Sequence, residues 1–278
     1  AGLEMEALTL EPLASSEAVL TKEEKEAGVA IVDIGGGTTD IAIFKDNIIR
    51  HTCVIPYGGG IITDDIKEGC SIIEKHAEQL KVKFGSAVPE MEKDSTFVTI
   101  PGLHGRQDKE ISLKTLAQVI NARVEEILEM VNTELKAYGA FEQKKKLIAG
   151  IVLTGGGSNL KHIRQLANYT TGFDSRLGYA NEYISNDKNQ LLKGPEYATA
   201  IGLLMESLKI RDKKTSVNEE EEVISEQPAV EKVNSEIEAS IQNEEPTIVE
   251  TAEAKRRTKL TIGQKIMESV KKFFEEVE

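Results

Sequence analysis

The order of apolar and polar residues predicts alternating strands and helices over the first 210 residues. Apolar, β-branched runs over 29–34, 41–44 and 48–55 predict three consecutive strands, since short runs rich in Val and Ile are typical of buried strands. Asp46-Asn47 predicts a tight turn between the last two runs, so we expect an antiparallel meander. The segments 97–100, 110–112 and 147–153 predict further short strands.

Helical spacing of apolar residues follows the meander. It predicts helices over 63–70, 72–84, 113–135, 159–169 and 195–208, with Thr63 as the cap of the first helix and Pro195 in the first turn of the last. The helix over 113–135 has the most regular apolar face, and Gly139 predicts its end. The alternation predicts an α/β domain with a small α+β subdomain over about 72–146.

Two glycine-rich turns interrupt this pattern. Gly35-Gly36-Gly37-Thr38 lies between two strands, whereas P-loops and dinucleotide-binding loops lead from a strand into a helix, so the context excludes both classes. Gly155-Gly156-Gly157-Ser158 leads from a strand into a helix. Glycines at such turns let backbone amides approach a phosphate, and bare backbone also accommodates a flat base or a ribose.

Asp33 ends the strand before the first glycine turn. A carboxylate in this place can hold Mg²⁺ through water, because Mg²⁺ keeps several waters and uses one or two carboxylates together with phosphate oxygens. Each glycine cluster alone is equally consistent with a tight turn. The two clusters in this order favour a nucleotide site.

Charge and cysteine content narrow the function classes. Lys plus Arg total 34 against 47 Asp plus Glu, a net charge of −13, which argues against general attraction to nucleic acid. Cys53 and Cys70 lack further Cys or His at metal spacing, so neither a disulfide scaffold nor a zinc site is indicated, and a reducing cytoplasmic compartment fits best. No run of eighteen apolar residues is present, and acidic residues within 1–14 argue against a signal peptide.

The charge is unevenly distributed along the chain. Residues 1–210 hold 23 basic and 30 acidic side chains, whereas 211–253 hold 4 basic and 13 acidic ones and no aromatic residue. Such a segment buries too little apolar surface to offset its ordering entropy, so we predict a disordered linker over 211–258.

The final segment, 255–278, is basic, with 7 basic and 4 acidic residues. Its apolar residues fall on one face of a predicted helix over 259–278, long enough to lie in a bilayer surface and too polar to cross it. The face and its flanking lysines comprise Ile262, Ile266, Met267, Val270, Phe273, Phe274, Lys271 and Lys272. Docking on a protein is the alternative for this helix.

The glycine turns together resemble the second half of the actin-like (ribonuclease H-like) ATPase superfamily, with 33–40 as the second phosphate loop and 153–158 as the adenosine motif. The segments 10–25, 56–60, 63–66, 77–87 and 176–178 narrow the resemblance to the FtsA family of bacterial cell-division proteins. The likeness covers residues 1 to about 210.

The resemblance implies an ATP-binding protein that forms actin-like filaments, binds FtsZ and other division proteins, and anchors FtsZ at the cytoplasmic face of the cell membrane at the division site. Its cofactors would be ATP and Mg²⁺, its lipid partner an anionic membrane surface, and nucleic acid would not be a partner. Gly35, Gly36, Gly37 and Thr38 would contact phosphate, and Asp33 would organise Mg²⁺. Gly155, Gly156, Gly157 and Ser158 would contact the nucleoside, with Glu78 and Lys81 near ribose or base.

One departure concerns the first half of the family's fold. Its first phosphate loop and catalytic side chain have no recognised counterpart here, and residues 1–28 resemble the end of the preceding subdomain. We therefore expect half a nucleotide cleft, no catalytic residue in this chain, and no ATP hydrolysis by it unaided. The alternatives are a pilus-assembly relative, or another actin-fold ATPase such as a DnaK-type chaperone or a sugar kinase, whose tail docks on a protein.

Overall fold

The computed structural model describes residues 2, 5, 7–102, 107–180, 192 and 194–225, with side chains as far as 212. The chain divides into two units, Ala1–Ser207 and Leu208–Glu278. The described part of the first unit contains the sheet, its covering helices and both glycine turns. The candidate site therefore lies within one compact unit.

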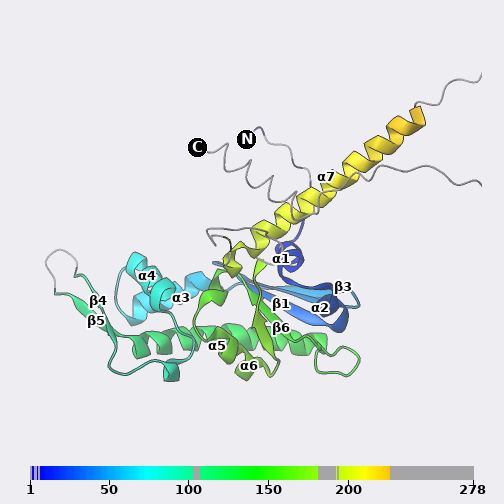
Figure 1. Ribbon diagram of the computed structural model, residues 1–278. Coiled ribbons are helices and arrows are strands. Elements are labelled where there is room, and N and C mark those ends of the chain that lie inside the picture. Colours follow the sequence, from blue (N-terminus) through cyan, green and yellow to red (C-terminus); the bar gives the residue numbers. More distant parts are fainter. Residues whose placement is uncertain are drawn as a thin grey trace, which may run out of the picture. The chain divides into compact units, whose positions relative to one another are not determined.

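A five-stranded mixed sheet forms the centre of this unit (Figure 1). The strand order is β3-β2-β1-β6-β7, with β1 antiparallel to β2 and parallel to β6. The three-strand meander predicted at the start of the sheet is confirmed. The strands of the sheet are β1 (Val29–Ile34), β2 (Thr39–Lys45), β3 (Ile48–Ile55), β6 (Ile151–Thr154) and β7 (Ser175–Leu177).

The helices are α1 (Glu11–Val19), α2 (Lys22–Ala27), α3 (Gly59–Gly69), α4 (Glu74–Phe84), α5 (Leu113–Tyr138), α6 (Ile163–Thr171) and α7 (Ala198–Ser225). Within the described residues, three short 3₁₀ turns lie between them: η1 (Pro89–Met91), η2 (Gly156–Asn159) and η4 (Pro195–Tyr197). A separate two-stranded sheet of β4 (Phe97–Ile100) and β5 (Lys109–Ser112) precedes α5, as predicted.

Strand β1 is buried along its whole length because alternate residues enter two cores. Ala30, Val32 and Ile34 belong to the core that also contains the apolar faces of α3, α5 and α6. Val29 and Ile31 point to the opposite core, which α1 and the start of α7 cover. Cover on both faces explains why the strand reads as a continuous apolar run rather than an alternating one.

Helix α5 joins the sheet to a smaller lobe, which consists of α3, α4, β4 and β5 (Figure 1). Its buried residues recur every three or four positions, and the helix ends at Gly139 in the left-handed conformation, φ 87°. Both features agree with the prediction. The helix packs against α3 and α6, so it fixes the smaller lobe relative to the sheet.

An ion pair ties β7 to α2, which lies about 150 residues earlier in the chain. Arg176 donates from Nε to Glu24 Oε1 at 2.6 Å and from Nη2 to Glu24 Oε2 at 2.7 Å, and Nη2 also donates to Val19 O at 2.8 Å. Glu24 is also the third residue of a capping box with Thr21. Burial alone would raise the pKa of Glu24, but the hydrogen bonds and charge of Arg176 lower it below its ordinary value.

Several predicted boundaries are wrong, each for a local reason. Helix α3 begins at Gly59, and Thr63 lies inside it instead of capping it. Strand β6 begins only at Ile151 because Gly150 adopts φ +66°. The helix predicted over 159–169 is split into η2 and α6, with His162 at φ 63° between them.

Helix α7 continues past its predicted end. The sequence predicts an end at Leu208, and the helix reaches Ser225. The segment 211–225 is rich in Lys and Glu, which favour helices intrinsically even where no core can form around them. The remaining linker, 226–258, and the predicted membrane helix, 259–278, lie outside the described residues.

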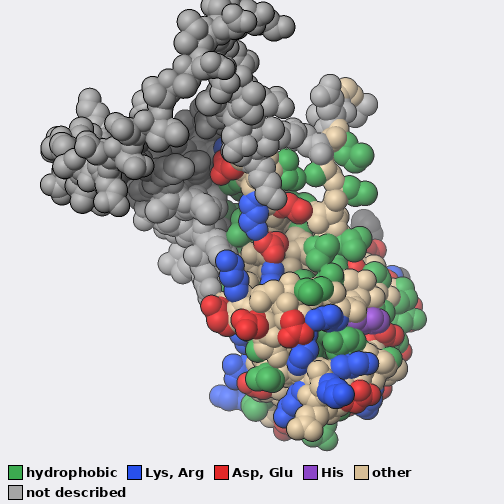
Figure 2. Space-filling model, turned by 90° about the vertical axis from the view of Figure 1, so that its right-hand side faces the viewer, with side chains coloured by type: hydrophobic (Ala, Val, Ile, Leu, Met, Phe, Trp, Pro, Cys, Tyr) green, Lys and Arg blue, Asp and Glu red, His purple; other side chains and the backbone are tan. Residues whose placement is uncertain are grey.

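The described surface carries charges of both signs. On the face shown in Figure 2, Lys and Arg side chains lie among Asp, Glu and apolar ones. Within the described residues, no helix has both the length and the apolar character that crossing a bilayer requires.

Candidate functional site

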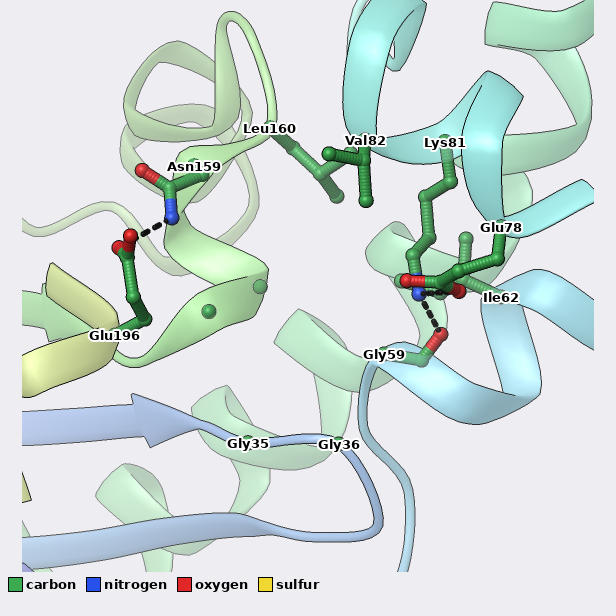
Figure 3. A pocket seen from close by; sticks show the side chains of 12 residues that line it. Gly35, Gly36, Gly59, Ile62, Glu78, Lys81, Val82, Asn159, Leu160 and Glu196 are labelled. Atoms are coloured by element: carbon green, nitrogen blue, oxygen red, sulfur yellow. Dashed lines mark hydrogen bonds and ion pairs between the residues drawn. The ribbon is translucent and has the colours of Figure 1, made fainter. Parts of the chain in front are cut away.

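A cavity of about 310 Å³ opens between the sheet and the smaller lobe (Figure 3). Both glycine turns border it, together with residues of α3 and α4. Its lining residues are Gly35, Gly36, Gly59, Ile62, Glu78, Lys81, Val82, Gly156, Gly157, Asn159, Leu160 and Glu196. The fold thus brings together two turns that are about 120 residues apart in sequence.

The first glycine turn presents bare backbone. A Cβ atom at Gly36 or Gly37 would meet no atom within 4 Å. Gly35 N donates to Thr38 O at 2.9 Å, which closes the turn. Among the residues that the structure describes, the amides of Gly36 and Gly37 donate to no protein acceptor. Two adjacent amides of this kind suit an anionic ligand.

The second turn lies directly on the end of β1. Gly155 adopts φ +80°, and a Cβ atom there would stand 2.3 Å from Asp33 Oδ1 and 2.6 Å from Ile34 O. Gly157 is equally close to the Ile34 side chain. Glycine is therefore required for the close approach of the two turns, as well as for any ligand contact.

Asp33 is buried, with 3% of its surface exposed. Its Oδ2 accepts hydrogen bonds from Ser15 at 2.5 Å and from Thr199 at 3.3 Å. Burial raises the pKa of Asp33 above its ordinary value, the two hydroxyls oppose this rise, and the nearby charge of Asp40 adds to it. The folded chain thus holds a carboxylate that a cation would stabilise.

Glu11, in the first turn of α1, belongs to the same group of carboxylates. Its pKa is raised by burial first and then by the charges of Asp33 and Asp40, while a hydrogen bond with Thr199 opposes the rise. Asp40 pairs with Asp33 across β1 and β2, and its Oδ2 accepts from Thr38 at 2.8 Å. A carboxylate with a raised pKa beside a polar site is a candidate general base.

The carboxylates do not form a complete metal site by themselves. Within the described residues, no three His, Cys, Asp or Glu side chains are arranged to hold a metal ion. This arrangement fits Mg²⁺ held by one carboxylate through water, since Mg²⁺ takes most of its ligands from waters and phosphate oxygens.

Opposite the glycine turns, Lys81 forms the centre of a closed polar cluster (Figure 3). Its ammonium donates to Gly59 O, to Thr63 Oγ1 and to Glu78 Oε2, each at 2.7 Å. Thr63 also donates to Glu78 Oε2 at 2.5 Å. Burial alone would raise the pKa of Glu78, but the bonds from Lys81 and Thr63 and the charge of Lys81 lower it below its ordinary value.

Two apolar side chains face each other across the cavity. Figure 3 shows Val82 of α4 and Leu160 after η2 pointing toward one another. Val82 is 72% exposed, so its side chain is accessible from the cavity. On the other wall, Asn159 donates to Glu196 Oε2 at 2.8 Å. The cavity offers a place for a flat ring between apolar walls.

Six of the predicted site residues line the cavity: Gly35, Gly36, Glu78, Lys81, Gly156 and Gly157. Gly37 belongs to the first turn, whereas Asp33 and Gly155 lie behind the two turns. The hydroxyl of Thr38 bonds to Asp40, and that of Ser158 is buried and donates to Thr154 O at 2.6 Å. These two hydroxyls are therefore engaged inside the protein.

Sequence reasoning missed the residues that support the site from other elements. Glu11, Ser15 and Thr199 surround Asp33 although two of them lie in α1 and the third lies in α7. The available indication for Glu11 was its position directly before Pro12, at the start of a helix. Nothing in the spacing of Thr199 indicated its role, because its contact with Asp33 spans 166 residues.

Asp33→Asn is expected to stabilise the ligand-free chain at neutral pH by about 0.5–2 kcal/mol, as for other substitutions that relieve a functional site. The amide keeps an acceptor for Ser15 and removes a buried charge. Because the folded pKa of Asp33 is raised, the charged form costs stability above that pKa, and the cost is lost as pH falls through it toward the ordinary 3.8. The gain should therefore disappear in acid.

Thermal unfolding at neutral and acidic pH measures this effect. Asp64→Asn, on the exposed face of α3, is the matched control and should change stability by less than about 0.5 kcal/mol. A destabilised Asp33→Asn variant at neutral pH would contradict the account of a desolvated carboxylate.

The sequence matches the family model "Cell division protein FtsA" over residues 30–202. It is 40% identical over 209 residues to the cell division protein FtsA of Neisseria meningitidis serogroup B, covering 75% of this chain and 50% of that protein. It is 37% identical over 231 residues to the cell division protein FtsA of Bacillus subtilis, covering 81% of this chain and 50% of that protein. The chain thus spans about half the length of these relatives.

Among solved structures, the chain resembles MreB5 of Spiroplasma citri bound to ADP, with a TM-score of 0.61 and 22% identity over 79% of this chain and 63% of that one. At this identity the likeness shows the fold alone. The fold is that of the actin-like ATPases, and the predicted fold class is confirmed.

Proposed function

Because the chain belongs to the FtsA family of cell-division proteins, we propose that it supplies one wall of an ATP site in an actin-like protein that tethers FtsZ filaments to the membrane. The observation that carries the nucleotide part is the cavity between the glycine turns, where the amides of Gly36 and Gly37 donate to no acceptor among the described residues. The relative of like fold that is bound to ADP supports the same ligand class.

Different residues of the cavity would contact different groups of a nucleotide. Gly35, Gly36 and Gly37 would receive the phosphates, and Asp33 would hold Mg²⁺ through water. Val82 and Leu160 would cover the base, which brings the ribose near Glu78. Mg²⁺ would neutralise phosphate charge beside the buried carboxylate.

Glu11 is a candidate in this chain for orienting a water for hydrolysis. It interacts with the charges of Asp33 and Asp40 and forms a hydrogen bond with Thr199, which also donates to Asp33. Such a role would add a catalytic residue to the site, for which the sequence predicts none. The remaining catalytic and phosphate-binding groups would come from sequence corresponding to the other half of the relatives.

The proposals of filament formation and membrane tethering rest on the family and on the segment 259–278. Self-association is supported by the similarity in fold to MamK, which was solved as a double helical filament. Binding to FtsZ, to other division proteins and to the cytoplasmic face of the membrane at the division site are proposals that follow from the family and from the amphipathic pattern of 259–278. The acidic linker would hold the folded part near the membrane without rigid contact.

Gly36→Val tests the nucleotide site. The new side chain would project into open space, so the fold should persist, while two methyl groups would occupy the position of a phosphate. We expect at least a tenfold loss of Mg-ADP affinity, about 1.4 kcal/mol, with unchanged circular dichroism and melting temperature.

Ala137→Val, on the exposed side of α5, is the matched control and should bind as the parent does. Equal affinity of the Gly36→Val variant and the parent, with both folded, would show that the glycine turn is only a turn.

A further inference from the structure

In the described part of the chain, Asp33 is a buried carboxylate without a basic partner. None of the ion pairs among the described residues includes it, although only 3% of its surface is exposed. Its donors are two hydroxyls, and both reach the same oxygen, Oδ2. Buried charges in proteins pair with an opposite charge or hold a metal, so this environment points to a cation.

The two hydroxyls come from helices that are far apart in sequence. Ser15 of α1 is fully buried, and its Oγ donates to Asp33 Oδ2 at 2.5 Å. Thr199 of α7 donates to the same oxygen at 3.3 Å, and its Oγ1 lies 2.9 Å from Ser15 Oγ. The three side chains therefore form one hydrogen-bonded cluster at the end of β1.

Backbone contact between the two helices fixes the place of these hydroxyls. A Cβ atom at Gly202 would stand 1.8 Å from Ala14 O, so α1 and α7 touch there with no side chain between them. Ala14 directly precedes Ser15, and Gly202 lies about one helical turn after Thr199. The hydroxyls therefore have little freedom to move away from Asp33.

The other carboxylate oxygen of Asp33 remains available. Among the described residues, no donor is bonded to Oδ1. A Cβ atom at Gly155 would stand 2.3 Å from Oδ1, so this oxygen lies against the second glycine turn. Fixing Oδ2 also orients Oδ1, because the two oxygens belong to one planar group. An oxygen held in this way suits a hydrated ion, since Mg²⁺ keeps several of its waters when it binds protein.

We propose that Ser15 and Thr199 are positioning residues for Mg²⁺, which hold the Asp33 carboxylate through Oδ2 so that Oδ1 accepts from a water of the ion. Hydroxyl donors stabilise the charged carboxylate without neutralising it, so its charge remains available to a cation. A lysine or arginine in the same place would compete with the ion. The inference rests on the proposed nucleotide function and names two residues outside the glycine turns that make nucleotide binding depend on Mg²⁺.

The proposal predicts a loss confined to the Mg²⁺-dependent part of binding. For the 278-residue chain, we expect the affinity for ADP to be at least tenfold higher in Mg²⁺ than in EDTA. Thr199→Val replaces the hydroxyl by a methyl group and should reduce this ratio at least threefold, while affinity in EDTA stays within twofold. Thr199→Ser keeps a hydroxyl and should return the ratio to that of the parent.

Two further variants complete the test. Ser15→Ala removes the shorter bond to Asp33 and should reduce the ratio more than Thr199→Val does. It introduces no larger group, so it serves as the second test if Thr199→Val does not fold. Thr133→Val is the matched control, because the Thr133 hydroxyl bonds to Glu129 O within α5, away from the cavity lining, and it should change neither affinity.

Equilibrium dialysis in Mg²⁺ and in EDTA measures these affinities. Equal losses in both conditions for Thr199→Val and Ser15→Ala would show that the hydroxyls only support the fold, and would overturn the proposal. An unchanged ratio in the folded variants would overturn it as well. If Mg²⁺ does not alter the affinity of the parent for ADP, this inference fails while the nucleotide function stands. If the parent binds ADP in neither condition, the proposed function fails too.

Discussion

Replacing Phe273 with Glu is expected to release the chain from anionic liposomes. Phe273 falls on the apolar face of the helix predicted over 259–278, and burying a Phe side chain contributes about 1.5–3 kcal/mol. Losing that contribution lowers affinity roughly tenfold to a hundredfold, and the new carboxylate opposes entry into the bilayer surface. Phe274→Glu should behave in the same way.

The matched control is Gln264→Glu. It introduces the same charge into the same segment, on the polar side of the predicted helix. Neutralising Arg256 and Arg257 should weaken binding mainly at low salt, since each basic residue near an anionic surface contributes about 1 kcal/mol and is screened by ions. Equal co-sedimentation of Phe273→Glu and Gln264→Glu would identify the tail as a protein-docking helix.

Supplying the other half of the relatives' length is expected to tighten Mg-ATP binding by well over tenfold, more than about 1.4 kcal/mol. The chain spans about half of its FtsA relatives, and we propose that it supplies one wall of the nucleotide site. The carboxylates Glu11, Asp33 and Asp40 should then share their charge with Mg²⁺ and with groups from the second wall.

Calorimetry on the 278-residue chain and on a chain extended at its N-terminus measures this difference. The 278-residue chain should bind weakly. Tight binding by that chain alone, equal to that of the extended protein, would contradict the expectation of a divided cleft.

The central fold could be predicted because its elements have local causes. The β-branched runs, the Asp46-Asn47 turn and the regular apolar face of α5 each predicted the observed element. The start of α3 was missed because it depends on contact with a distant turn: Gly58 is required by three carbonyl oxygens of 35–38. A local rule for helix caps therefore favoured Thr63.

The candidate site could likewise be predicted only where its residues have local causes. Clusters of glycine mark tight turns in a sequence because glycine allows backbone conformations that other residues rarely adopt, so both turns could be found. The partners of Asp33 could not, because Ser15 and Thr199 come from α1 and α7 and meet only when the sheet is covered. The length of α7 was missed because the high charge of 211–225 predicts only that the segment buries little apolar surface. Helix formation there depends instead on the intrinsic helix propensity of its residues.

The central claim is that the glycine turns 35–37 and 155–157 form one nucleotide site. Glycine-selective ¹⁵N NMR of the 278-residue chain, titrated with Mg-ADP, tests it most directly. The account predicts that the amide signals of Gly36, Gly37, Gly156 and Gly157 move together along one saturable curve, and that in Gly36→Val the signals of Gly37, Gly156 and Gly157 stay in place. Millimolar Mg-ADP that leaves these signals unmoved, or that shifts only glycines outside both turns, would contradict it.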